Sequence, residues 1–178
     1  MIFTVSVILF IGLILATGAE RIYELVVSTR NAKLAFISGG IEYGRGHLPF
    51  MIALHTALLA GAIIEVVILD RQFLGSPGWV FLAIAIGCQA ARYWFIWALG
   101  SQWNTRVIVI PGAKLVRKGP YSLPWLRHPN YWVVAIEGFA LPMVHSAWIT
   151  AIMFTVLNAV LLLGFRIPTE NKALKGLR

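Results

Sequence analysis

The sequence is poor in charged residues, and those it has are mostly basic. Only 12% of its 178 residues are Asp, Glu, Lys or Arg, and 7 acidic residues stand against 15 basic ones. Hydrophobic residues make up 59% of the chain, and the mean hydropathy is +0.79. No soluble domain of this length can bury so much apolar surface, which excludes a water-soluble globular protein. We expect one membrane-embedded domain over residues 1–178.

Cysteine is almost absent as well. Cys88 is the sole cysteine, which excludes an intrachain disulfide and a metal site built from cysteines. The sequence also has no internal repeat, no low-complexity tract and no G-x-G-x-x-G fingerprint. The net charge of +8 does not indicate nucleic acid, because the basic residues lie between apolar runs rather than on a soluble module. We therefore expect no metal and no nucleic-acid partner, and instead contact with membrane lipids.

Long apolar runs account for most of the chain. A helix needs roughly 20 apolar residues to cross a bilayer. Three runs approach this length, at residues 2–19, 50–69 and 79–99. The run 131–165 is too long for one crossing, and Pro142 favours a reversal that divides it into helices 131–144 and 148–165. The prediction is an all-α, polytopic bundle of about five membrane segments, of which the fourth is short.

Basic residues fall almost entirely on one side of this predicted topology. With the N-terminus outside, residues 20–49, 100–130 and 166–178 are cytoplasmic, and they contain 13 of the 15 basic residues. This distribution agrees with the positive-inside rule. No positive region precedes the first apolar run, so we expect a retained anchor rather than a cleaved signal.

The segment 115–131 interrupts the apolar runs with basic and aromatic residues. It reads LVRKGPYSLPWLRHPNY. Three prolines and a glycine fix its backbone, so we expect a loop of defined shape. Cations and aromatic rings held at a membrane edge suggest a site for a small polar or nucleotide-like molecule. An anchor at the lipid headgroups is an equally common use of the same residue types.

Two other predicted loops contain local patterns that indicate secondary structure. Residues 20–49 begin with acidic and basic residues that include Glu24. We expect this segment to continue the first helix, with these charged side chains paired on a face exposed to solvent. Residues 106–110 read RVIVI, a β-rich pattern, and a Pro-Gly turn pair follows. This pattern predicts a small hairpin beneath the membrane.

Three ionisable residues lie inside predicted membrane segments, namely His55, Arg92 and Glu137. Because an α-helix rises about 1.5 Å per residue, each of them lies roughly 8–10 Å from the cytoplasmic end of its segment. Arg92 and Glu137 can therefore neutralise each other between helices. The pair either holds the bundle together or forms the floor of a ligand pocket. Glu65 and His145 lie towards the outer face and are expected to be interfacial or packing groups.

The last apolar run ends in RIPTE. Four residues separate Arg166 from Glu170, which places both on one helical face if the helix continues, although Pro168 opposes continuation. The alternative is a basic stop-transfer end followed by a polar tail.

Two segments, GPYSLPWLRHPNYWVVAIEGFAL and, farther along, RIPTENKAL, follow a known order of motifs. The order is G-x-Y, R-H-P-x-Y, a Glu six residues on, and R-x-x-x-E at the end of the last helix. This combination resembles the integral-membrane isoprenylcysteine carboxyl methyltransferases. The first half, with RIYELVVSTRN and GIEYGRGHLPFMIALH, is similar to the bacterial branch of that family. That branch includes O-methyltransferases acting on lipids made by type III polyketide synthases, such as alkylpyrones and alkylresorcinols.

The resemblance implies a multi-pass helical enzyme that uses S-adenosylmethionine at the cytoplasmic face, with the cofactor half at about 100–178. A lipidic small-molecule acceptor would enter sideways between helices. The residues expected to bind the cofactor are Tyr121, Arg127, His128, Pro129, Tyr131 and Glu137. The expected catalytic pair is Arg166 and Glu170, and the residues expected to contact the acceptor are His55, Arg92 and Trp94.

The residue types suit methyl transfer. Aromatic faces stabilise a sulfonium cation, and His128 or Arg127 can pair with the methionine carboxylate. If the acceptor is a carboxylate, Arg166 orients it; if it is a phenol or enol, Glu170 is the candidate base. Two other functions are compatible with the bulk composition, a non-catalytic transporter or scaffold and a sterol-reductase-like enzyme. The reductase would need basic residues for a second phosphate group, and the sequence has no obvious candidates.

Overall fold

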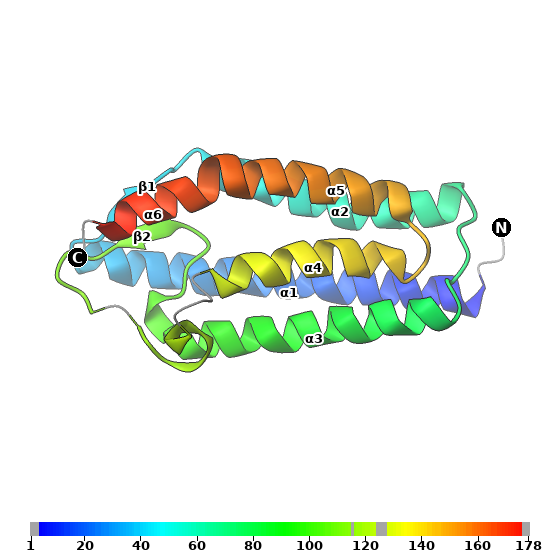
Figure 1. Ribbon diagram of the computed structural model, residues 1–178, viewed down its shortest axis with the longest axis horizontal. Coiled ribbons are helices and arrows are strands. Elements are labelled where there is room, and N and C mark those ends of the chain that lie inside the picture. Colours follow the sequence, from blue (N-terminus) through cyan, green and yellow to red (C-terminus); the bar gives the residue numbers. More distant parts are fainter. Residues whose placement is uncertain (1–3, 115, 124–127, 176–178) are drawn as a thin grey trace.

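The computed structural model describes residues 4–114, 116–123 and 128–175. Five helices run along one long axis: α1 (Val5–Ile37), α2 (His47–Ile68), α3 (Ser76–Leu99), α4 (Pro129–Met143) and α5 (Trp148–Leu161) (Figure 1). A further helix, α6 (Ile167–Lys175), ends at the opposite end of the bundle from the start of α1 (Figure 1). The predicted all-α bundle is confirmed.

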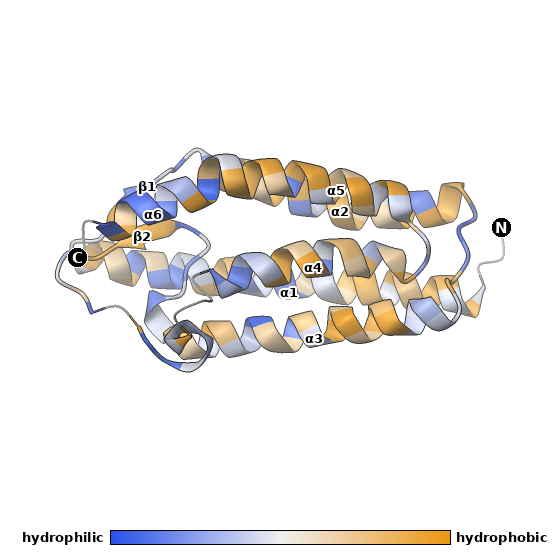
Figure 2. Ribbon diagram, in the orientation of Figure 1, coloured by the Kyte–Doolittle hydropathy of each residue, from blue (hydrophilic) through white to orange (hydrophobic). Residues whose placement is uncertain are grey.

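The outer surface of the bundle is apolar. In the described part of the chain, four helical stretches are long and apolar enough to cross a membrane: Val5–Ile37, His47–Ile68, Ser76–Gln102 and Trp148–Lys175. Large apolar side chains such as Ile8, Trp79 and Leu163 are exposed on these helices, and hydrophobic residues dominate the ribbon (Figure 2). A surface of this kind is stable in lipid and not in water. With 15 residues, α4 is the short fourth segment that the sequence predicts.

The first and last helices both extend beyond their apolar runs. At 33 residues, α1 continues past the apolar run that ends at residue 19, as the sequence predicts. The last helix passes through a π-helical turn, Leu162–Arg166, into α6. Pro168 has no N–H to donate to the preceding turn, and a locally widened turn is a common way to accommodate such a gap. Helical geometry therefore continues through residues 166–170.

Two short strands lie at the end of the bundle that carries α6 (Figure 1). Strand β1 (Ile41–Tyr43) pairs antiparallel with β2 (Val107–Val109). The predicted local hairpin at residues 106–112 is wrong, because the partner of β2 comes from the loop between α1 and α2. Ala173 of α6 packs on Val107 and Val109, so burial of this face holds the long-range pairing in place.

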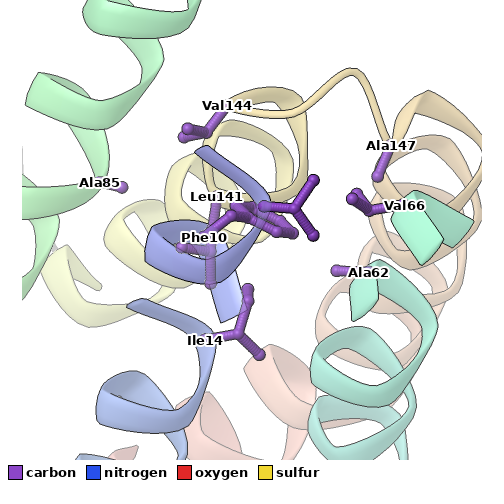
Figure 3. Packing of buried hydrophobic residues seen from close by; sticks show 9 residues of the cluster. Phe10, Ile14, Ala62, Val66, Ala85, Leu141, Val144 and Ala147 are labelled. Carbon is purple, nitrogen blue, oxygen red and sulfur yellow. The ribbon is translucent and has the colours of Figure 1, made fainter. Parts of the chain in front are cut away.

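The other end of the bundle contains the main apolar core. Phe10 and Ile14 of α1 belong to one buried cluster with Val66 of α2 and Leu141 of α4 (Figure 3). Nearby, Glu65 accepts hydrogen bonds from the N–H groups of Ile149 and Thr150, at 3.2 and 2.8 Å, and so caps α5. His145 is also buried, at 1% exposure. Both residues pack at this end of the bundle, in agreement with the prediction.

Candidate active site

A large cleft opens at the end of the bundle that carries the sheet and α6. Its volume is about 1490 Å³, and its walls come from α1, α2, the segment between α3 and α4, the start of α4, and α6. Hydrophilic residues are concentrated at this end of the molecule (Figure 2). Pockets for one small ligand usually measure about 300–1,000 Å³. The cleft therefore has room for two ligands at once.

Side chains from two distant motifs meet in this cleft. The Tyr131 hydroxyl donates a hydrogen bond to Glu170 Oε2, and Arg166 Nε donates to the Tyr131 oxygen at 3.1 Å. His128 Nδ1 lies 3.4 Å from Glu170 Oε1. The His128 ring stacks on the Tyr131 ring with centroids 5.5 Å apart. All four side chains line the cleft, as the sequence predicts for the R-H-P-x-Y and R-x-x-x-E motifs.

Local geometry explains why these side chains converge. Pro129 is the first residue of α4, where its missing N–H leaves no hydrogen bond unmade. His128 therefore precedes the helix and Tyr131 lies in its first turn. Because the last helix continues through Pro168, Arg166 and Glu170 lie one turn apart, and both reach Tyr131.

Arg166 has a second partner within the protein. Its Nη2 donates to the backbone oxygen of Thr105, in the segment between α3 and β2. The side chain is only 5% exposed. The guanidinium group is thus held from two sides, by a phenol oxygen and by a carbonyl oxygen.

Tyr121 lies in a short helical turn, Gly119–Ser122, and also lines the cleft. Burial raises the pKa of Tyr121 above its usual range, and the negative charge of Glu170 raises it further. The phenol therefore stays protonated and can donate a hydrogen bond to a ligand. Arg127, which the sequence also predicts to bind the cofactor, lies outside the described residues.

A second group of charges lies between α1, α3 and α4. Arg92 donates to both oxygens of Glu24, at 2.8 and 2.5 Å. Arg21 donates to Glu24 at 2.8 Å and to Glu137 at 2.6 Å. The predicted contact between Arg92 and Glu137 is present but long, at 3.9 Å. Two cations and two anions therefore neutralise one another inside the bundle.

The expectation that Glu24 faces solvent is wrong, because its exposure is only 3%. As α1 continues without a break, this face turns towards α3 and α4. A polar stripe at helical spacing marks the buried face, with members every three or four residues: Thr17, Arg21, Glu24, Ser28 and Asn31. This spacing is the signal in the sequence that identifies the buried charges.

The residues predicted to contact the acceptor have different environments. His55 and Arg92 line the cleft, and His55 Nδ1 lies 2.8 Å from the backbone oxygen of Met51. Trp94 is not among the described residues that line it. Instead it is half-exposed on α3 and packs against Gly119.

Comparisons with known proteins identify a family and a bacterial relative. Residues 80–176 match the isoprenylcysteine carboxyl methyltransferase (ICMT) family. The chain belongs to this family. It is also similar to YpbQ of Bacillus subtilis (strain 168), a protein described as uncharacterized, with 38% identity over 157 residues, or 88% of this chain and 90% of YpbQ. No solved structure matches the chain.

Membership of the ICMT family identifies the protein as a membrane methyltransferase. The matched residues include most of α3 and all of α4, α5 and α6, and with them the group formed by Tyr131, Arg166 and Glu170. They do not include α1 or α2, although both helices supply part of the cleft wall.

Proposed function

We propose that this ICMT-family protein transfers a methyl group from S-adenosylmethionine to an oxygen atom of a lipidic acceptor at the cytoplasmic membrane face. The main support is the meeting of two distant motifs in one cleft. Near α6 the lining of the cleft includes polar side chains such as His128, Arg166 and Glu170. Between α1 and α2 its lining includes apolar side chains such as Leu15, Leu59 and Ile63. A polar donor and an apolar acceptor suit these two parts.

The residues in the polar part fit S-adenosylmethionine. The rings of Tyr121 and Tyr131 offer aromatic faces for a sulfonium cation. His128 and Asn171 add polar groups for the methionine and nucleoside parts. When bound, the cofactor supplies an electrophilic methyl group. The protein must mainly align the two molecules and exclude water, and the sheet and α6 lie over this end of the cleft.

Glu170 is the candidate base, and its neighbours favour a hydroxyl acceptor. Nε and Nη2 of Arg166 already donate to Tyr131 and to Thr105, so a carboxylate cannot use the side-on pair of N–H groups that these two nitrogens present. An acceptor hydroxyl must lose its proton, and the Glu170 carboxylate in the cleft can take it. This supports a phenolic or pyrone lipid over a prenylcysteine-type carboxylate.

The orientation of the bundle supports a cytoplasmic site. The cleft lies at the end opposite the start of α1, and basic residues such as Arg106, Lys114 and Lys175 line it there. Since basic residues favour the cytoplasmic side, the N-terminus lies outside and α6 inside.

The test is incubation of the purified protein with labelled S-adenosylmethionine and a panel of alkylresorcinols, alkylpyrones and prenylcysteines. We expect methylation of at least one phenolic or pyrone lipid. Calorimetry in detergent should show binding of S-adenosylhomocysteine that His128→Ala loses and that Lys33→Ala, at an exposed position of α1, retains. A wild-type protein that neither binds this product nor methylates any of the lipids contradicts the proposal.

A further inference from the structure

The carbonyl group that holds Arg166 lies in a segment that has little secondary structure of its own. Thr105 is part of the bend between the short turn Gly100–Gln102 and β2. Its backbone oxygen accepts the hydrogen bond from Arg166 Nη2. A carbonyl in such a bend has a defined position only if other groups fix the peptide.

Ser28 of α1 fixes this peptide directly. Its hydroxyl oxygen accepts a hydrogen bond from the Thr105 N–H at 3.0 Å and lies 2.7 Å from Thr105 Oγ1. It donates its own proton to Asn104 Oδ1 at 2.8 Å. Ser28 is 2% exposed, so water cannot replace these bonds. The N–H of Thr105 is thus held by α1, while its C=O holds Arg166.

Asn31, one turn farther along α1, fixes the preceding residues. Its Nδ2 donates to the backbone oxygens of Gly100 and Trp103, at 3.1 and 2.8 Å. Asn104 Nδ2 donates in return to the Ser28 backbone oxygen at 3.1 Å. The whole bend is therefore attached to one face of α1.

We propose that Ser28 and Asn31 are positioning residues for Arg166, acting through the carbonyl of Thr105. This inference rests on the proposed function. Both residues lie outside the stretch that matches the ICMT family, so the matched half of the chain does not contain everything that orients its own arginine. A displacement of about 1 Å in a positioned group can cost roughly 100-fold in rate. Substitution of either residue should lower kcat and leave ligand binding unchanged, because neither side chain lines the cleft.

The test compares kinetic constants of Ser28→Ala and Asn31→Ala with those of the wild type, using labelled S-adenosylmethionine and the lipid of the panel that the wild type methylates. We expect kcat to fall roughly 10–100-fold. The KM for S-adenosylmethionine and the Kd for S-adenosylhomocysteine should stay close to wild type. Ser28→Thr keeps the hydroxyl and should restore kcat.

Thr29→Ala is the matched control, because the Thr29 hydroxyl is exposed and, within the described part of the chain, bonds only to the Leu25 carbonyl of its own helix, at 2.8 Å. It should retain wild-type kcat. If Ser28→Ala does not fold, Asn31→Ala carries the same test. Wild-type kcat in the folded alanine variants overturns the inference while the proposed function stands. A wild-type protein that methylates no lipid overturns both.

Discussion

Tyr131 and Glu170 are joined by a hydrogen bond although 39 residues separate them in the sequence. The bond connects the first turn of α4 to the first turn of α6. Arg166 donates to the same phenol oxygen at 3.1 Å. A carboxylate that accepts a hydrogen bond from a fixed phenol cannot rotate freely, so Tyr131 sets the direction in which Glu170 faces the cleft.

Removing this hydroxyl should therefore impair turnover. In Tyr131→Phe we expect kcat to fall roughly 10–100-fold, because Glu170 and Arg166 lose their common partner. Thermal unfolding in detergent should change little, since the ring remains. Tyr23→Phe removes an exposed hydroxyl from α1 and should have wild-type kinetics. Equal kcat values for Tyr131→Phe and the wild type contradict the role assigned to the phenol.

Arg166 and Glu170 themselves should be required for methyl transfer. Glu170→Gln keeps the shape of the side chain but removes the base, so kcat should fall by about 10²–10⁴. Arg166→Ala should reduce kcat to a comparable extent. Both variants should still fold and bind S-adenosylhomocysteine in calorimetry. Lys172→Gln, at an exposed position of α6, is the control. Retained turnover in both variants removes the pair from the mechanism.

The buried charge group should matter for stability. Glu24→Gln leaves Arg21 and Arg92 with one carboxylate between them, and breaking a buried ion pair costs about 3–5 kcal/mol. We expect a correspondingly lower free energy of unfolding in mixed micelles. Glu20→Gln changes a partly exposed acid on the same helix and should stay within about 0.5 kcal/mol of wild type. Similar free energies of unfolding for Glu24→Gln and Glu20→Gln would show that the buried charge group contributes little to stability.

Two glycines give opposite predictions for the same substitution. A Cβ atom on Gly138 would lie 1.9 Å from the Phe154 ring, so Gly138→Ala forces α4 and α5 apart. Overpacking of this kind costs about 1–3 kcal/mol. A Cβ on Gly87 of α3 meets nothing within 4 Å, so Gly87→Ala should be neutral or stabilise by up to about 1 kcal/mol. Unfolding measurements in mixed micelles check both, and a stabilised Gly138→Ala would be inconsistent with the close contact of α4 and α5.

Local patterns were enough to predict the helices. The motif resemblance singled out His128, Tyr131, Arg166 and Glu170, which meet in the cleft, whereas Trp94 and Glu137 are not among the described residues that line it. Pro142 marks the reversal between α4 and α5 because a proline limits a helix locally. The strand pairing could not be predicted from the sequence. Ile41–Tyr43 has three residues, and its partner lies in another loop, so no local pattern contains the pair. Glu24 was misplaced because acids and bases at helical spacing also occur on solvated helices.

By itself the sequence determined that this protein has the apolar surface of a membrane protein and how its helices follow one another in the bundle. These properties depend on composition and on short-range spacing, which a single chain displays directly. Only the tertiary structure decided which partner each charge has. Arg92 pairs mainly with Glu24, and Ser28 reaches the carbonyl that holds Arg166, because helix packing brings together groups that the sequence keeps far apart.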